Sequence, residues 1–537
     1  MDSSFQQYER ALGFWRARRL TEARTVLEGA WRATGRRSIF GTLLMGYILR
    51  DSQQYVSEIE WLQRLVKEFA AAPEREQLAD AWSLLGSACR SLGRVREAVA
   101  ALLRSAEIEP RPQQKLVECS NAIFAANAAP VAEYGATEMQ GLYARYRELL
   151  HDYMASVEAV PYGQPSWRHE QIRVGYISAD LHEHPVTQYV RSLLTRYDAD
   201  DFRVYVYDIG RTHDAVTVAL QRPEAVWREA AKLTEAGDFA GLAAQIRADE
   251  IDVLVDLAGH TSGNALPVFG WRAAPVQISG LGYFNSTGLY ETTGFLSDVY
   301  CAPEAESPYF VEPLLRLPHS HFCYEPYSEF PEPGAPPCLA RGYVAFGCFN
   351  NFAKLTDEML RLWGRILAAL PTARLVLKHQ LFDSAEGLAY TRERFARLGL
   401  PLERIELRGF SHDYLAEYRE IDIALDPSPY PGGATTCEAL YMGVPVVTLV
   451  GDRHGARFGY SFLANIGLAE LAAPTPERYV ELAVGLAQDA ELLCALHAGL
   501  RGLMQHSPLM DGQQYVRDVE ELYRRLVVQA RSRISDD

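Results

Sequence analysis

The chain has 537 residues and carries 53 Lys and Arg side chains against 69 Asp and Glu side chains, a formal net charge of −16. This length is typical of about three domains, and the acidic balance argues against general nucleic-acid binding, which requires a basic surface. The eight cysteines form no C-x-x-C pair, which argues against a disulfide framework and a structural zinc site. No signal peptide is recognised, and the most apolar run, Val444–Gly451, is too short to span a membrane. We therefore expect a cytoplasmic protein with neither a nucleic-acid nor a membrane partner.

Residues 1–155 are predicted to form an all-helical domain of tetratricopeptide-like repeats. Gly86 and Ala98 provide the small side chains required where two helices of such a repeat cross, and Pro110 ends the second helix. The repeat spacing is irregular, so a generic helical bundle is the alternative. Stacked helix pairs leave a concave surface that usually holds a peptide or a protein.

Strand-like and helical stretches alternate from residue 171 onward and predict two α/β domains, 165–330 and 340–537, joined by a proline-rich linker. The first contains strand-like runs at 172–178, 203–208, 251–257 and 276–279, and the second at 343–349, 374–378, 404–408, 421–426 and 445–450. Two doubly wound halves place a ligand-binding cleft between them. A long amphipathic helix is predicted at 514–533.

The clearest chemical signal is a turn rich in Pro and Gly that follows the fourth strand of the second half. Gly432 and Gly433 let the backbone approach a ligand closely, and Thr435 and Thr436 add hydroxyls beside the free N–H groups of a first helical turn. These groups suit a diphosphate. A carboxylate would repel phosphate, so Glu438, one turn further on, suits ribose hydroxyls. The alternative is that Thr435 is an ordinary N-cap and Glu438 a first-turn acid.

The loop after the first strand of the second half carries Asn350, Asn351 and Lys354, and its position at the carboxyl end of the strand faces the cleft. A lysine there can neutralise the charge that develops on a departing phosphate oxygen. The alternative is a solvated surface lysine.

The strands of the first half also end in candidate polar loops. His184 follows the first strand, faces the same cleft and titrates near neutrality, although a capping or core role is the alternative. Further candidates for the cleft follow later strands: Gly259, His260, Gly282, Tyr283 and His319.

Three patterns resemble metal sites, and none leads us to predict a metal ion. His182 and His184 lack a third ligand at a useful spacing. His319 and His321 could bind a metal, but a loop lining the cleft is the favoured interpretation. The D-x-D pattern at 198–200 lies before a strand, hence away from the cleft, and is predicted to be a solvated turn.

Several separated motifs between Arg173 and Leu526 resemble glycosyltransferase family 41, which includes O-GlcNAc transferase and the plant SPINDLY protein. The resemblance is carried by residues 346–354, 435–445 and 282–288 and is nearest to SPINDLY. It implies a GT-B fold of two facing Rossmann-like domains, with the acceptor side in the first and the nucleotide sugar in the second. It also implies inverting transfer of a sugar, without a metal or other cofactor, to Ser or Thr of an intracellular protein held by the helical repeats.

Carried over position by position, the resemblance assigns roles to the candidate residues. Lys354 would hold the diphosphate and assist its departure, Thr435 and Thr436 would complete the phosphate site, and Glu438 would hold the ribose. His184 would lie near the reacting centre.

Two further positions also match the family. Asp249 matches a carboxylate proposed to relay a proton, and Arg457 stands where O-GlcNAc transferases, but not SPINDLY, have arginine.

The chain departs from the family pattern at the phosphate loop, where Gly433 and Ala434 replace histidine or threonine and remove side-chain donors. Phe284 replaces a proline, and Gly280 replaces a bulky aromatic residue. These departures leave the donor open between UDP-GlcNAc and GDP-fucose. Two alternatives to a protein O-glycosyltransferase also stay open: a GT-B enzyme acting on a small glycan or metabolite, and a non-catalytic nucleotide-binding scaffold.

Overall fold

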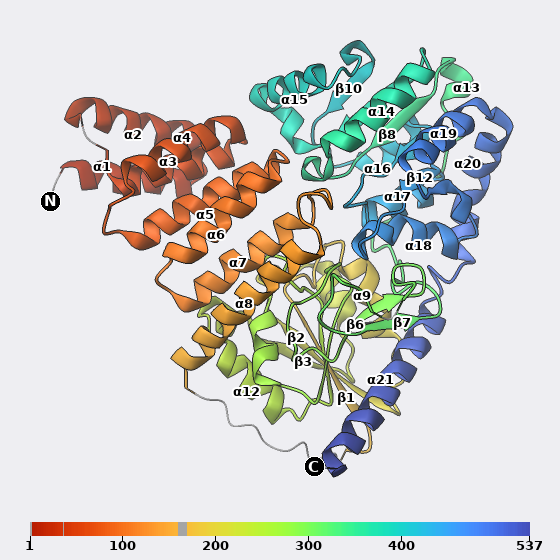
Figure 1. Ribbon diagram of the computed structural model, residues 1–537, viewed down its shortest axis with the longest axis horizontal. Helices are drawn as coiled ribbons and strands as arrows, with labels where there is room; N and C mark the ends of the chain where they lie inside the picture. Colours follow the sequence, from red (N-terminus) through yellow and green to blue (C-terminus); the bar gives the residue numbers. More distant parts are fainter. Residues whose placement is uncertain (1–2, 36, 159–168, 305, 537) are drawn as a thin grey trace. The chain divides into compact units, whose positions relative to one another are not determined.

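The computed structural model describes residues 3–35, 37–158, 169–304 and 306–536 (Figure 1). The described chain begins with eight helices and continues into two α/β domains, each built on its own sheet. The helices are α1 (Ser3–Arg16), α2 (Leu20–Thr34), α3 (Ile39–Asp51), α4 (Tyr55–Glu68), α5 (Arg75–Ser91), α6 (Val95–Ile108), α7 (Pro112–Ala126) and α8 (Ala136–Ser156). None of the helices in these ranges has the length and apolar character that a membrane crossing requires.

The close helix crossing expected at Gly86 is observed between α5 and α6. A Cβ atom added at Gly86 would lie 2.6 Å from Leu102 Cγ and 3.0 Å from the carbonyl oxygen of Ala98, so only glycine fits this crossing. Ala98 is itself fully buried. The packing of this helix pair is that of a tetratricopeptide-like repeat.

The first sheet has seven parallel strands in the order β3-β2-β1-β4-β5-β6-β7. Its strands are β1 (Ile172–Ser178), β2 (Phe202–Asp208), β3 (Val226–Glu229), β4 (Val253–Asp256), β5 (Val276–Ser279), β6 (Gly294–Asp298) and β7 (Leu314–Leu317). The helices of this domain are α9 (Thr187–Thr195), α10 (Ala215–Leu220), α11 (Ala231–Glu235) and α12 (Phe239–Ala248), with a 3-10 helix, η1 (Leu266–Trp271). The strand order reverses between β1 and β4, so the loops that follow these two strands border the crevice where doubly wound sheets bind ligands.

The second sheet has the order β10-β9-β8-β11-β12-β13. Its strands are β8 (Ala345–Cys348), β9 (Arg374–Lys378), β10 (Ile405–Arg408), β11 (Ile423–Leu425), β12 (Val446–Leu449) and β13 (Ala472–Ala473). Its α-helices are α13 (Cys338–Arg341), α14 (Asp357–Ala369), α15 (Ala385–Arg397), α16 (Tyr414–Glu417), α17 (Ala434–Tyr441), α18 (Phe458–Asn465), α19 (Pro476–Gln488) and α20 (Ala490–Gln505), and a last helix, α21 (Gly512–Asp536), follows them. The order reverses between β8 and β11, where both second-half motifs lie.

The predicted C-terminal helix is α21, and it packs against the first sheet (Figure 1). The hydroxyl of Tyr523 lies 3.3 Å from that of Tyr176 on β1, and the hydroxyl of Tyr515 donates to the carbonyl of His321 at 2.9 Å. The helix therefore closes the first α/β domain with residues from the end of the chain. The predicted fold class, an all-α region followed by two Rossmann-like domains, is confirmed.

The chain divides into two compact units that cut across the predicted domain limits. One unit combines Met1–Ala129 with Asn351–Arg361 and Leu377–Phe410, and the other contains the rest of the chain. Within the first unit, the Glu386 carboxylate on α15 accepts hydrogen bonds from the backbone N–H and the hydroxyl of Ser57 on α4.

Helix α8 belongs to the second unit, although the sequence grouped it with the repeats. Arg147 on α8 donates to the carbonyl of Gly288 at 2.6 Å, and the hydroxyl of Tyr153 donates to the carbonyl of Gly237 at 2.6 Å. These bonds fasten α8 to the first α/β domain.

Candidate functional site

The two motifs of the second half meet at the start of α17. The Thr435 hydroxyl donates to Asn350 Oδ1, which lies in the loop after β8, at 3.0 Å. The N-cap of α17 is Gly433, which has no side chain to accept from the first-turn N–H groups. Thr435 is thus already inside the helix, and the alternative that it is an ordinary N-cap does not hold. Its hydroxyl bridges two strand ends instead.

Asp426, directly after β11, holds this loop in place through hydrogen bonds to its buried carboxylate. It is 2% exposed and accepts from the Gly432 N–H at 2.7 Å and from the Thr436 and Thr448 hydroxyls at 3.2 and 2.9 Å. The Thr436 hydroxyl is therefore held within its own loop by Asp426, whereas the Thr435 hydroxyl donates across to Asn350 in the loop after β8. The sequence identified Asp426 only as a strand end, because its partners could not be known without the fold.

The two glycines of the loop differ in the space around them. A Cβ at Gly432 would lie 2.3 Å from Thr436 Oγ1 and 2.8 Å from Thr435 Oγ1, which is too close for any side chain. At Gly433 the nearest atom is the Tyr189 hydroxyl at 3.7 Å. The position where the resembling family places a larger residue is thus open here. A small cavity at the start of α17 is lined by residues that include Phe349, Asn350, Tyr418, Thr435 and Thr436.

Glu438 lies one turn into α17 and is 5% exposed. Its Oε1 accepts from the Tyr414 hydroxyl on α16 at 2.9 Å. Burial raises the pKa of Glu438 to about 7, although the Tyr414 hydrogen bond opposes the shift. The carboxyl therefore changes charge near neutrality, and donors such as vicinal hydroxyls would favour its ionised form. The sequence offered no signal for Tyr414.

Lys354 ends a 3-10 helix, η2 (Phe352–Lys354), in the same loop as Asn350. Asn351 caps this helix by accepting from the Ala353 N–H at 3.0 Å. The segment that follows is held by Arg394, which donates to the carbonyl of Leu355 at 2.6 Å. Lys354 is half-buried, so the lysine extends from a fixed turn rather than from a solvated surface.

In the first half, His184 lies in the loop after β1 with 36% of its side chain exposed. Its Nδ1 accepts from the Val186 N–H at 3.3 Å and lies 3.8 Å from the Asp180 carboxylate. Burial lowers the pKa of His184 against the opposing effect of Asp180, so the imidazole is neutral at pH 7. A neutral ring that accepts at Nδ1 carries its proton on Nε2 and can donate from there.

His260 was expected to line the cleft, but the structure buries it completely. Its Nε2 donates to the carbonyl of Thr287 at 2.9 Å, and its ring packs edge-on against Tyr146 at 4.8 Å between centroids. Burial lowers the pKa of His260 to about 4. Tyr283, 1% exposed, packs on the other side, where a Cβ at Gly259 would lie 2.4 Å from its ring. These residues form the core beneath the loop.

Other residues expected at the cleft have different surroundings. A Cβ at Gly282 would lie 1.8 Å from the carbonyl oxygen of Leu257, so this glycine allows a close backbone approach. His319 is exposed in the loop after β7.

Asp249 lies just before β4, at the amino edge of the sheet, whereas the His184 loop is at the carboxyl edge. Its Oδ1 pairs with Arg228 at 2.6 Å and its Oδ2 accepts from the Tyr207 hydroxyl at 2.8 Å. This geometry is that of a structural ion pair, and the proton-relay role of Asp249 stays a prediction.

Arg457 donates to two backbone carbonyls, that of Tyr300 at 2.7 Å and that of Gly451 at 3.3 Å. It thus links a loop of the first half to a loop of the second, and its role toward a nucleotide sugar stays a prediction. The D-x-D pattern forms the expected turn before β2, with the Asp200 N–H donating to the Asp198 carboxylate at 3.0 Å.

Comparison with known proteins places the chain in a family. The model of glycosyl transferase family 41 matches residues 136–332 and 338–519. The chain is 38% identical over 365 residues to the probable UDP-N-acetylglucosamine–peptide N-acetylglucosaminyltransferase SPINDLY of Petunia hybrida, which covers 66% of this chain and 38% of that protein. The SPINDLY protein of Arabidopsis thaliana is also 38% identical, over 66% of this chain and 39% of its own length. The chain thus spans less than half the length of these curated relatives.

A solved structure resembles the whole chain. A lysine-to-methionine mutant of the O-GlcNAc transferase from Thermobaculum terrenum superposes with a TM-score of 0.81 at 28% identity, covering 99% of both chains. The helical region is therefore shared along with both α/β domains, and the predicted GT-B type of fold is confirmed.

Proposed function

The chain belongs to glycosyl transferase family 41, and from that premise we propose that it transfers a sugar from a nucleotide-diphosphate sugar to Ser or Thr hydroxyls of other proteins. The observation that carries this proposal is the Thr435–Asn350 hydrogen bond, which joins the loops after β8 and β11 into one polar surface beside Glu438. The names of the relatives, peptide N-acetylglucosaminyltransferases, support a protein acceptor.

The start of α17 would bind the diphosphate. Gly433 supplies no side-chain cap, and its carbonyl accepts from the Thr436 N–H at 3.1 Å, so the N–H groups of Ala434 and Thr435 would bind an anion, where the helix dipole favours negative charge. The Thr435 hydroxyl, which donates to Asn350 in the structure, would turn to donate to the phosphate, and Lys354 would offset the charge that grows on the leaving phosphate. Glu438, held by Tyr414, would accept from the ribose hydroxyls.

The transfer step would be a single displacement that inverts the sugar. The acceptor oxygen forms a bond to the anomeric carbon while the bond from that carbon to the diphosphate oxygen breaks. The nucleoside diphosphate leaves, and the hydroxyl proton passes to a base. Lys354 and the start of α17 would supply the positive charge for the leaving group, so we propose that no metal takes part in the transfer. His184, with its proton on Nε2, would donate a hydrogen bond near the reacting centre.

We propose UDP-GlcNAc as the first donor to test, since the curated relatives are named for it, and GDP-fucose as the second. The helical repeats at 1–155 would hold the acceptor protein, because stacked helix pairs present a surface suited to peptide binding.

Intact-mass analysis of candidate acceptor proteins after incubation with each donor tests this function. We expect a mass gain of one sugar per modified hydroxyl, which Lys354→Ala abolishes while the unfolding temperature is kept. Lys67→Ala, an exposed lysine on α4, is the matched control and should retain the gain. Full activity in Lys354→Ala would contradict the assignment. Donor consumption with mass gain only on a small glycan would favour the small-acceptor alternative, and nucleotide binding without turnover would favour the scaffold.

A further inference from the structure

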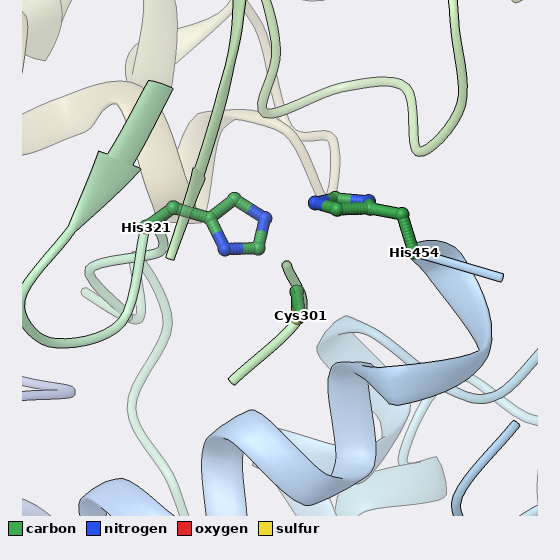
Figure 2. Close-up of side chains that lie close together, drawn as sticks. All are labelled: Cys301, His321 and His454. Carbon is green, nitrogen blue, oxygen red and sulfur yellow. The ribbon is translucent and has the colours of Figure 1, made fainter. Parts of the chain in front are cut away.

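Three buried side chains converge at the contact between the two α/β domains of the second unit. Cys301 follows β6, His321 follows β7, and His454 lies between β12 and the 3-10 helix η6 (Gly455–Arg457) (Figure 2). Their potential ligand atoms all lie within 4.8 Å of one another, and the residues are 2%, 1% and 3% exposed. We propose that they bind one zinc ion.

The ligand types and their reach suit this ion. Thiolate sulfur and imidazole nitrogen are the preferred zinc ligands, with bond lengths of about 2.3 and 2.0 Å, which give tetrahedral separations of roughly 3.3–3.6 Å. Starting within 4.8 Å of one another, the three atoms need to close by at most about 1.2–1.5 Å. In Figure 2 the two imidazole rings lie on either side of a gap with Cys301 below it, and their planes are tilted by 55° with the ring centroids 5.2 Å apart.

An outer shell already orients His321. The Asp298 carboxylate accepts from His321 Nδ1 at 2.5 Å, from the His321 backbone N–H at 3.0 Å and from the Ser461 hydroxyl at 2.8 Å. A carboxylate bound to one ring nitrogen fixes the tautomer and directs the other nitrogen to a metal. Nε2 of His321 is therefore the ligand atom.

His454 is oriented by a backbone carbonyl. Its Nδ1 donates to the carbonyl of Phe284 at 3.1 Å, so Nε2 has the free lone pair and accepts from the Ser297 hydroxyl at 2.8 Å. The Ser297 hydroxyl has a second acceptor, the carbonyl of Asp298, at 3.5 Å. It can turn to that carbonyl when Nε2 binds the ion, and its oxygen or a water completes the tetrahedron.

The charges balance in this buried place. Zinc carries two positive charges, the Cys301 thiolate and the Asp298 carboxylate carry one negative charge each, and both imidazoles are neutral. The thiol proton leaves to solvent as the sulfur–zinc bond forms, with no change of oxidation state. Because burial of uncompensated charge is costly, it matters that the bound ion would leave these groups without net charge.

The ion would stabilise the fold and take no part in sugar transfer. Cys301 and His321 belong to the first α/β domain and His454 to the second, so one ion ties the two domains together. The expectation of no structural zinc rested on the lack of a C-x-x-C pair. Ligands at positions 301, 321 and 454 are too far apart in sequence for a spacing rule to detect.

Metal analysis of the full-length protein tests the proposal. The protein is stripped with a chelator, loaded with Zn²⁺ and freed of excess, and metal per chain is measured by mass spectrometry. We expect about one zinc per chain and at least a tenfold loss in Cys301→Ser and in His454→Asn. Cys323→Ser is the matched control, because Cys323 is equally buried but lies at 3.5 Å from the Ser192 hydroxyl, outside the cluster.

A second measurement needs no variant. Wild-type protein loaded with Co²⁺ should show a thiolate-to-cobalt charge-transfer band and the absorption of tetrahedral cobalt. Less than a tenth of a zinc per chain, an unchanged zinc content in Cys301→Ser, or cobalt without the thiolate band would each overturn the proposal. The cluster would then be a hydrogen-bonded network that holds a protonated thiol.

Discussion

The loops after β11 and after β4 occupy equivalent places in their sheets, yet they use their polar residues in opposite ways. After β11, Asp426 anchors the turn, and the Thr435 hydroxyl donates across to Asn350. After β4, His260 is turned inward and is completely buried beside Tyr146 of α8. The loop position alone therefore does not make a residue part of a site.

The difference comes from what covers each loop. Helix α8 lies over the first α/β domain and supplies tyrosines that enclose His260, whereas the start of α17 borders a small cavity. The enclosed loop contributes to stability, and we propose that the loop beside the cavity binds the ligand. Substituting one residue of a matched pair shows whether the free energy of unfolding or the ligand affinity changes.

The largest effect is expected from the two histidines of the first half. His260→Ala removes a buried ring and its bond to Thr287, which should lower the free energy of unfolding by about 3 kcal/mol. His184→Ala, at a partly exposed position, should change that free energy by less than about 1 kcal/mol but lower the transfer rate at least tenfold. Denaturant unfolding and the transfer assay measure the two quantities. An equal loss of stability in both variants would show that the two histidines do not differ in their structural role.

The two glycines of the α17 loop give the next effect. Gly432→Ala should weaken nucleotide binding at least tenfold, because its Cβ would displace both threonine hydroxyls. Gly433→Ala should bind within about twofold of wild type, since its Cβ makes only an ordinary contact with the Tyr189 hydroxyl at 3.7 Å. Calorimetric titration with UDP and GDP checks both variants, and similar affinities would show that the hydroxyls do not position the ligand.

The smallest effect concerns the pH dependence set by Glu438, whose pKa is raised from 4.5 to about 7. The folded protein holds this proton up to about pH 7 and the unfolded chain loses it near pH 4.5, so stability falls as pH rises between them. Wild type should therefore lose stability relative to Glu438→Gln from pH 5 to pH 8. Nucleotide affinity should rise a few-fold over the same range in wild type and stay flat in Glu438→Gln. A rise in both proteins would exclude Glu438 as the ribose acceptor.

The sequence predicted the alternating α/β pattern and the loops that form the candidate donor site, because the spacing of apolar runs and glycines is local information. It missed the short strands β3, β6, β7 and β13, whose two to five residues carry little pattern. The burial of His260 could not be foreseen, since α8 lies more than a hundred residues earlier. The same holds for the ion pair of Asp249 with Arg228, which depends on the neighbour relations within the sheet.

We propose that the start of α17 binds the diphosphate of the donor, and calorimetric titration with UDP and GDP tests this binding most directly. Thr435→Val should weaken binding of the preferred nucleotide about tenfold, because it removes the hydroxyl that would turn from Asn350 to the phosphate. The control is Thr475→Val, since Thr475 is a true N-cap that accepts from the Arg478 N–H at 3.2 Å on α19. This control should bind the nucleotide with the affinity of the wild type. Equal affinities in the Thr435 and Thr475 variants, or no binding of either nucleotide, would contradict it.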